Sequence, residues 1–133
     1  MILIDDLKRD EGYRRHPYLD TAGKSTAGYG RNLDDLGISP EEAEYLLRSD
    51  IARVEGELDA ALPWWRTLSD ARRRALCNMC FNLGIPRLLG FKRTLGFLEA
   101  GKWDDAALAA IQSQWARQVG ARATRIARLI REG

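Results

Sequence analysis

The stretch DEGYRRHPYLDTAGKSTAGYGR, residues 10–31, begins with two acidic residues that end an N-terminal helical pattern. Residues 1–11 carry apolar side chains at helical spacing, and Gly12 is the residue type that most often follows a helix C-terminus. Carboxylates are unfavourable there, because aligned backbone dipoles leave the last turn of a helix negative. Asp10 and Glu11 therefore break a local rule, and such positions are often functional.

The remainder of this stretch predicts a β-hairpin. Pro17 excludes a continued helix, whereas Tyr18 and Leu19 favour extended structure. Residues 20–24, DTAGK, form a turn in which glycine can adopt a positive φ. Residues 25–30, STAGYG, are expected to form the returning strand, whose two glycines allow another part of the chain to approach its backbone closely.

Beyond residue 38 the sequence predicts only helices. Ser39, Pro40 and Glu42 match a capping box with proline in the first helical position, and the apolar residues that follow keep helical spacing until Pro63. Further helices are expected at residues 69–83, with Thr67 or Ser69 as the cap, and at residues 94–100, 104–116 and 121–131.

These segments predict a mostly helical α+β fold in a single domain. Its expected parts are a small lobe with a β-hairpin (residues 1–38), a long connecting helix (39–62) and an all-helical lobe (63–133), with a cleft at the seam. At 45% hydrophobic and 30% charged residues, the 133-residue chain has a globular composition. No apolar run approaches the roughly 18 residues of a membrane span, so we expect no signal peptide and no membrane insertion.

Charge is distributed unevenly along the chain. Residues 1–62 hold 8 Lys and Arg against 14 Asp and Glu, whereas residues 63–133 hold 13 against 5. Two interpretations stay open. The basic half is a solvated face that balances the acidic half, or it attracts a polyanion such as nucleic acid or an anionic cell-wall polymer.

Cys77 and Cys80 form a CxxC pattern in surroundings that do not favour a redox motif or a zinc site. No strand is predicted before them, and the only histidine, His16, is distant in the sequence. On a helix they lie at i and i+3 of one apolar face, so we expect buried thiols that pack as small hydrophobic side chains. No metal and no cofactor is expected.

Three side chains of the opening stretch are candidates for chemistry. Glu11 ends the first helix, Asp20 stands at the hairpin turn and Thr26 begins the second strand. Two carboxylates in a cleft suffice for glycoside hydrolysis, in which one acts as the acid and the other as a base or nucleophile. Glu11, beside the negative helix end, is expected to keep its proton, and Asp20, among backbone N–H groups, to stay ionised. Acidic residues in turns and at helix ends are also common on ordinary surfaces.

The spacing of these residues resembles the active-site signature of phage-type lysozymes, glycoside hydrolase family 24. The matching pattern, E-G-x(5)-Y-x-D-x(5)-T-x-G-x-G, is formed by Glu11, Gly12, Tyr18, Asp20, Thr26, Gly28 and Gly30. Four later stretches are similar to the family's helical segments in the same order: SPEEAEYLLRSDI, DARRRALCNMCFNLG, GFKRTLGFLEAGKWDDAA and SQWARQVGARATR. The resemblance covers nearly the whole chain and implies a lysozyme-like fold.

The resemblance implies a muramidase that cleaves the β-1,4 bond between N-acetylmuramic acid and N-acetylglucosamine in bacterial peptidoglycan. It makes Glu11 the general acid, Asp20 the base and Thr26 the residue that positions the attacking water. The reaction is expected to invert, which needs about 6.5 to 9.5 Å between the carboxyl groups. An endolysin of this kind is expected to be a monomer that stays in the host cytoplasm until it is released to the cell wall.

The resemblance also implies residues outside this trio. Phe81, Thr94, Gly30 and Asn32 are the implied substrate contacts, although Phe81 fits core packing equally well. Arg122 matches an arginine that approaches the catalytic acid.

This sequence departs from the family pattern at several positions. Arg31 stands where many relatives have histidine, with Asp50 or Asp70 as candidate partners. Ala109 replaces a polar position, and the loop before Ser39 is shorter than in longer members.

Two other functions remain open from the sequence. A lytic transglycosylase also uses a glutamate, but it closes the sugar on itself without water, which leaves Asp20 and Thr26 without a role. A helical nucleic-acid-binding module would use the arginines of the second half, but it leaves the acidic half and the hairpin unexplained. We expect no stable binding of nucleic acid.

Overall fold

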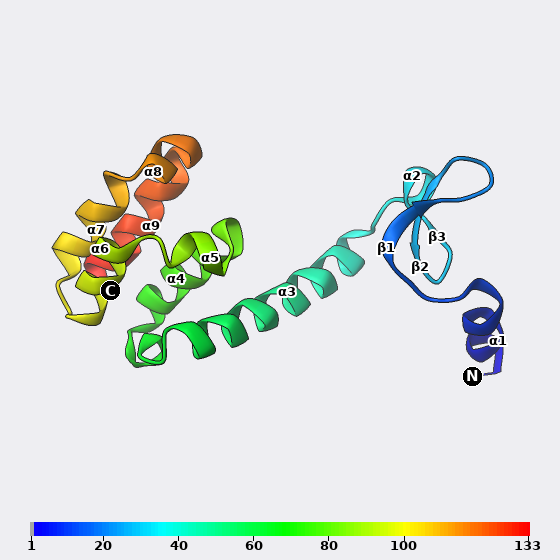
Figure 1. Ribbon diagram of the computed structural model, residues 1–133, viewed down its shortest axis with the longest axis horizontal. Coiled ribbons are helices and arrows are strands. Elements are labelled where there is room, and N and C mark those ends of the chain that lie inside the picture. Colours follow the sequence, from blue (N-terminus) through cyan, green and yellow to red (C-terminus); the bar gives the residue numbers. More distant parts are fainter. Residues whose placement is uncertain (1) are drawn as a thin grey trace. The chain divides into compact units, whose positions relative to one another are not determined.

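The computed structural model describes residues 2–133, which contain helices over most of their length and one three-stranded antiparallel sheet (Figure 1). The mostly helical α+β fold predicted from the sequence is therefore confirmed. The chain divides into two compact units, Met1–Leu46 (unit 1) and Leu47–Gly133 (unit 2). The boundary between them falls within the long helix α3 (Pro40–Ala61).

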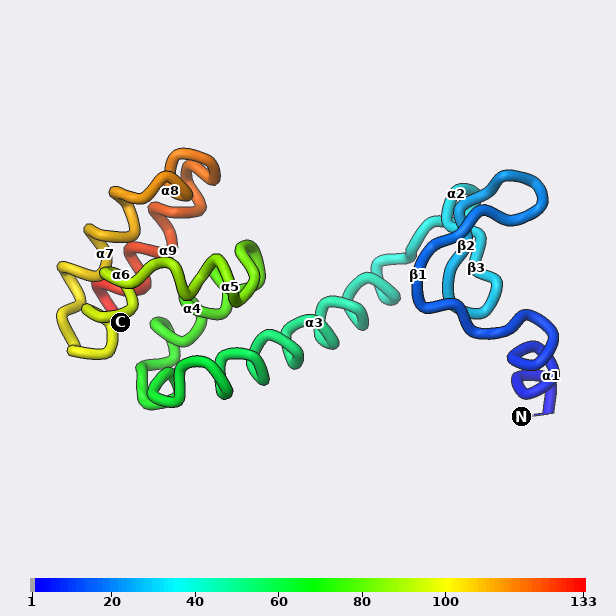
Figure 2. Tube along the Cα trace, in the orientation of Figure 1, coloured from blue at the N-terminus to red at the C-terminus, as the bar shows by residue number. Residues whose placement is uncertain are grey.

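Unit 1 begins with helix α1 (Ile2–Glu11), which ends as predicted at Gly12. Gly12 has a φ of +71°, and its N–H donates to the carbonyl of Lys8 at 3.0 Å. The hairpin follows as β1 (Arg14–Leu19) and β2 (Ser25–Gly28) (Figure 2). Tyr18 pairs with Thr26 across these strands. This confirms the helix, the turn and the first strand that the sequence predicts.

Two features of unit 1 differ from the prediction. The returning strand ends at Gly28, because the chain turns at Tyr29 and Gly30 and comes back as a third strand, β3 (Arg31–Asn32). The sheet order is β1-β2-β3. The segment after it, expected to be a loop, contains the short helix α2 (Leu33–Leu36), whose N-cap Asn32 accepts a hydrogen bond from the Asp35 N–H at 3.0 Å.

Helix α3 begins with the predicted capping box. The Ser39 hydroxyl oxygen accepts from the Glu42 N–H at 3.2 Å, and Glu42 Oε1 accepts from the Ser39 N–H at 2.9 Å. Arg31 binds the same carboxylate with both terminal nitrogens at 2.8 Å and donates to the Gly37 carbonyl. The expectation that Arg31 pairs with Asp50 or Asp70 is wrong, because Glu42, fixed by the cap, already offers it both oxygens.

Unit 2 packs the remainder of α3 and the helices after it around a hydrophobic core. Its further elements are η1 (Trp65–Thr67), α4 (Asp70–Leu83), α5 (Ile85–Leu88), α6 (Lys92–Glu99), α7 (Trp103–Ile111), α8 (Gln114–Val119) and α9 (Ala121–Glu132). Helix α9 packs against α4, α7 and α8, and α6 packs against α7 (Figure 1). Leu58, Leu76, Met79 and Ile130 are completely buried at the centre of this core.

Serine side chains mark where two helices of unit 2, α4 and α8, begin. The single helix predicted at residues 104–116 is wrong, because α7 ends at Ile111 and the Ser113 hydroxyl starts α8 by accepting from the Ala116 N–H at 3.2 Å. Of the two candidate caps for α4, Ser69 is the one used. The Thr67 hydroxyl instead donates to the Trp64 carbonyl at 2.6 Å.

The end of α9 is fastened to α4 by Arg72. Its Nε donates to the Ile130 carbonyl at 2.7 Å, and its guanidinium lies 3.7 Å from the centre of the Trp103 ring. A guanidinium over an aromatic face is attracted to the π electrons, and it also satisfies a carbonyl that a helix end leaves without a partner.

Both cysteines are free thiols on α4. Cys80 is buried, as expected, whereas Cys77 is half-buried. Burial raises the pKa of Cys77 to about 11, so its thiol is protonated at neutral pH. Within residues 2–133 the structure contains no helix that is long and apolar enough to span a bilayer.

Leu76→Ala is expected to lower the free energy of unfolding by about 3 kcal/mol, because Leu76 is completely buried and its truncation leaves a cavity. Urea denaturation followed by circular dichroism measures the change. Leu108→Ala removes the same atoms from a side chain that is 53% exposed, and it should change stability far less. Equal losses in the two variants would contradict the core described above.

Glu42→Gln is expected to lower the melting temperature at neutral pH and to have no effect in strong acid. The Ser39 backbone N–H, followed by the Ser39 hydroxyl and Arg31, lowers the pKa of Glu42 from its ordinary 4.5. A carboxylate with a lowered pKa adds stability above its unfolded-state pKa, and this is lost as the pH falls through the folded-state value. Melting curves across this pH range test the difference. Glu41→Gln, an exposed neighbour, should melt like the wild type at every pH.

Candidate active site

The side chain of Glu11, the last residue of α1, lies directly over the backbone of Gly30. A Cβ atom at position 30 would stand 2.6 Å from Glu11 Oε2 and 3.0 Å from its Cδ, which is closer than atoms can pack. Gly30 also has a φ of +73°, in the region that favours glycine. Glycine at position 30 thus leaves the room that the Glu11 carboxyl group occupies.

Aromatic contacts hold the turn that carries Gly30 against the end of α1. The ring of Tyr29 lies 5.8 Å from that of Tyr13, and the ammonium group of Lys8 lies 5.6 Å from the Tyr29 ring centre. Lys8 and Tyr13 flank the end of the helix on either side of Glu11. The β2–β3 turn and the exposed Glu11 side chain are therefore positioned by the same cluster.

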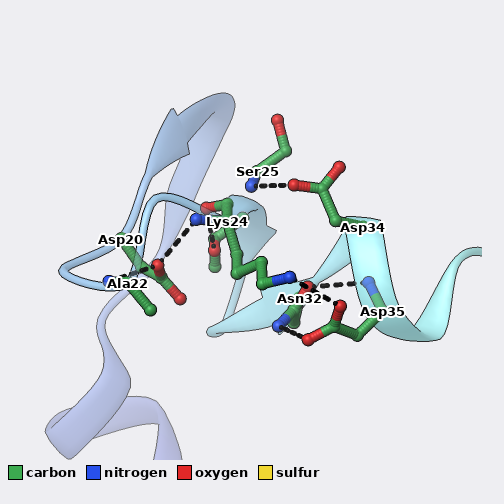
Figure 3. A network of polar contacts seen from close by, with 8 residues as sticks. Asp20, Ala22, Lys24, Ser25, Asn32, Asp34 and Asp35 are labelled. Carbon is green, nitrogen blue, oxygen red and sulfur yellow. Dashed lines mark hydrogen bonds and ion pairs between the residues drawn. The ribbon is translucent and has the colours of Figure 1, made fainter.

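Asp20 lies at the hairpin turn, where its side chain organises the backbone. Its Oδ1 atom accepts hydrogen bonds from the N–H groups of Ala22 and Lys24, both at 2.9 Å (Figure 3). The Asp20 N–H donates to the Lys24 carbonyl, and the Gly23 N–H donates to the Asp20 carbonyl. No described residue donates to Oδ2, so one carboxylate oxygen is held and the other is available.

Thr26 is connected to Asp20 through Lys24. The Thr26 hydroxyl donates to the Lys24 carbonyl at 3.0 Å, while the N–H of Lys24 donates to Asp20 (Figure 3). Thr26 is 3% exposed, and its strand position is fixed by pairing with Tyr18 on one side and Asn32 on the other. Because its proton is committed to a carbonyl, the Thr26 oxygen keeps its lone pairs for an incoming donor.

Helix α2 supports the hairpin turn through two of its acidic side chains. Asp34 accepts from the Ser25 N–H at 2.8 Å, and Asp35 pairs with the Lys24 ammonium group at 3.1 Å (Figure 3). Asn32, predicted as a substrate contact, uses its side-chain amide to bind Asp35 and to cap α2. The structure therefore gives Asn32 a supporting position, and its contact with substrate stays a prediction.

The other predicted residues belong to unit 2. Phe81 is 44% exposed, so the core-packing interpretation of this residue is wrong. Thr94 is buried at 2% exposure near the start of α6. Arg122 donates to the side-chain oxygen of Asn78 at 2.8 Å, and its approach to Glu11 stays a prediction.

Unit 1 thus carries the two carboxyl side chains that acid–base cleavage of a glycosidic bond requires, Glu11 at the end of α1 and Asp20 at the hairpin turn, with the Thr26 hydroxyl on the returning strand. The described residues contain no group of three His, Cys, Asp or Glu side chains placed to hold a metal ion. Two residues of the site are not predicted from the sequence. Lys24 connects Asp20 with Thr26, and the Tyr29 ring contacts Tyr13 beside Glu11. The signal for Tyr29 is its place between two glycines, whereas Lys24 acts mainly through its backbone, which no side-chain pattern can reveal.

Comparison with known proteins shows which family the chain resembles. A family model described as phage lysozyme matches residues 8–131. Probable T4-type lysozyme 2 of Dictyostelium discoideum is 30% identical over 160 aligned positions, which cover 98% of this chain and 94% of the relative. An endolysin of Acyrthosiphon pisum secondary endosymbiont phage 1 is 37% identical over 83 positions, which cover 59% of this chain and 55% of the relative.

A longer relative is the pre-baseplate central spike protein Gp5 of Enterobacteria phage T4, which is 29% identical over 161 positions. The match covers all of this chain and 28% of that protein, so the chain spans less than a third of the spike protein's length. The alignment is longer than the 133 residues of the chain, so the relative contains residues that this chain lacks.

The fold and the family match together define a lysozyme-type glycosidase of the peptidoglycan-hydrolysing class. The chain belongs to the phage lysozyme family, as the sequence resemblance predicts.

Gly30→Ala is expected to reduce peptidoglycan hydrolysis about 100-fold, because the new methyl group displaces the Glu11 carboxyl group from its position. Turbidity assays on purified peptidoglycan measure the rate. Gly28→Ala is the matched control: it has a similar positive φ of +66°, but a Cβ there meets no atom within 4 Å. Both variants should lose about 1 to 2 kcal/mol of stability from backbone strain. Equal activities in the two would contradict the role of Gly30.

Proposed function

We propose that this protein is a muramidase that hydrolyses the β-1,4 bond between N-acetylmuramic acid and N-acetylglucosamine with inversion at the anomeric carbon. Glu11 donates a proton to the leaving oxygen, Asp20 takes a proton from the attacking water, and Thr26 positions that water. The protein acts as a monomeric endolysin in bacterial lysis, reaching the wall from the host cytoplasm. The observation that carries the proposal is the Asp20–Lys24–Thr26 turn.

The two carboxylate oxygens of Asp20 have different surroundings, and this difference supports the assignment of Asp20 as the base. Oδ1 is fixed by two backbone N–H groups, so the carboxylate cannot rotate away without breaking the turn. Oδ2 remains for a water molecule. The Thr26 oxygen, whose own O–H donates to the Lys24 carbonyl, accepts a hydrogen bond from the second O–H of this water, which keeps that proton. A water that donates to both groups directs a lone pair at the sugar, as general base catalysis requires.

The position of Glu11 supports its assignment as the acid. Its side chain is exposed and lies over a glycine, so a sugar oxygen can approach the carboxyl group without meeting a neighbouring side chain. The proton that Glu11 gives to the leaving oxygen and the proton that Asp20 takes from water balance the reaction. Its products are one new reducing end and one free sugar hydroxyl.

Glu11→Gln is expected to lower the rate of reducing-end release from purified peptidoglycan by about 10²- to 10⁴-fold, the usual contribution of a general acid. Glutamine keeps the shape of the side chain and removes the transferable proton. Asp10→Asn makes the equivalent change at the neighbouring exposed residue, whose carboxylate binds Arg9 and no other side chain among residues 2–133, and it should leave the rate near that of the wild type.

Product analysis separates the proposed reaction from its alternative. Mass spectrometry should find muramic acid reducing ends, and NMR of the first product should show the α-anomer, because a β bond cleaved with inversion gives α. Products lighter by one water would identify an anhydro-forming transglycosylase. Full activity in Glu11→Gln, with a melting curve unchanged from wild type, would refute the assignment of the acid.

A further inference from the structure

Strand β2 extends one residue beyond its last pair with β3, on the side of the hairpin turn. That last pair is Thr26 with Asn32. The same register would place Leu33 opposite Ser25, but Leu33 is the first residue of helix α2. Strand β3 thus offers no residue opposite Ser25, and the Asp34 carboxylate accepts the Ser25 N–H instead, at 2.8 Å (Figure 3).

The N–H of Ser25 and the carbonyl of Lys24 belong to the same peptide group. This carbonyl accepts from the Asp20 N–H at 2.9 Å and from the Thr26 hydroxyl at 3.0 Å. A peptide group is planar, and in the trans form its C=O and N–H point in opposite directions, so the orientation of one fixes that of the other. By holding the N–H, Asp34 also constrains the carbonyl that holds the Thr26 hydroxyl.

The charge of Asp34 strengthens the bond at the other end of this peptide group. A carboxylate is a stronger acceptor for a backbone N–H than a neutral carbonyl is. It polarises the amide, so that the Lys24 carbonyl oxygen becomes a better acceptor, and linked hydrogen bonds strengthen one another in this way. The Thr26 O–H is therefore held more firmly, and the lone pairs of its oxygen are left for the water of the proposed reaction.

Helix α2 presents Asp34 from a fixed position. The Asn32 side chain caps the helix by accepting from the Asp35 N–H at 3.0 Å, and it donates to the Asp35 carboxylate at 2.9 Å. Asp35 in turn pairs with the Lys24 ammonium group at 3.1 Å. Because Asn32 also belongs to β3, α2 is bound to the sheet at its N-cap and through Lys24. These contacts keep Asp34 within reach of Ser25.

We propose that Asp34 is a positioning residue for the hydrolytic water, acting through the Lys24–Ser25 peptide group on the Thr26 hydroxyl. This inference rests on the proposed function, in which Thr26 positions that water. Asp34 itself contacts neither the sugar nor the water. Its loss therefore weakens the attack of water and leaves substrate binding intact, which lowers kcat and leaves KM nearly unchanged.

Kinetics on soluble peptidoglycan oligosaccharides of one length measure kcat and KM separately, below the melting temperature of each variant. Asp34→Ala removes the acceptor and should lower kcat about tenfold, because a small misplacement of a reacting group is costly. Asp34→Asn keeps an uncharged acceptor oxygen and should recover most of this loss. A higher KM with kcat unchanged would overturn the proposal.

Asp104→Ala is the matched control. Asp104 is exposed and is the second residue of α7, as Asp34 is the second residue of α2. Each alanine variant therefore removes one negative charge from the first turn of a helix, but Asp104 belongs to unit 2 and does not contact the hairpin turn. Asp104→Ala should keep the wild-type kcat. Equal kcat values for the two alanine variants would overturn the proposal.

A double-mutant cycle shows whether Asp34 acts through Thr26. Thr26→Val removes the hydroxyl and keeps the branched shape of the side chain. Asp34→Ala should lower kcat in the wild-type background and leave it nearly unchanged in Thr26→Val, because the hydroxyl through which Asp34 acts is already absent. A merely structural role would lower kcat by the same factor in both backgrounds, and that result would overturn the proposal.

NMR tests the contact itself, independently of catalysis. The Ser25 amide proton should move upfield in Asp34→Ala, because it loses a charged acceptor, and an unchanged shift would overturn the proposal. The single variants separate this inference from the proposed function. A fully active Thr26→Val would refute the role of Thr26 in the proposed function and the inference with it. An impaired Thr26→Val beside a fully active Asp34→Ala would overturn the inference alone.

Discussion

The Asp20 carboxylate is the constraint on which the arrangement of unit 1 depends. By accepting two backbone N–H groups it fixes residues 20–24 and so sets the register in which Tyr18 faces Thr26. That register determines where β2 ends, where the chain turns at Gly30 and where β3 returns. Glu11 then lies over a turn whose position was set ten residues earlier. One oxygen of the Asp20 carboxylate thus holds the hairpin turn, and the other is available for the proposed reaction.

The helices of unit 2 are held in place by close packing against one another. Small residues are buried where α7 and α9 meet, including Ala107, Ala110, Ala123 and Ala127, and they let the two helices approach closely. Larger side chains such as Leu76 and Ile130 fill the space toward α4. Polar groups are few inside this core, and within residues 2–133 the buried side-chain atom without a hydrogen-bond partner is Arg73 Nε.

The sequence predicts the elements whose signals are local. Gly12 after α1, the DTAGK turn and the Ser39 capping box each act within a few residues, and the structure has all three. The features that the sequence does not predict depend on tertiary context. The turn at Gly30 lies against the side chain of Glu11 from another element, and the break at Ser113 competes with a helical pattern that continues through it. For the site, the trio's positions could be predicted from spacing, but the role of Lys24 could not, because its backbone makes the connection between Asp20 and Thr26.

The Glu42 carboxylate binds both the cap of helix α3 and the arginine that begins strand β3. One of its oxygens accepts from the Ser39 N–H and from Arg31, and the other accepts from Arg31 alone. A helix end normally frays independently of its surroundings. Here the first turn of α3 cannot open without releasing the arginine that begins β3, and β3 cannot detach without exposing the cap. The two segments therefore form one cooperative folding unit. Local opening at the point where the chain leaves the sheet is thereby coupled to opening of the sheet edge.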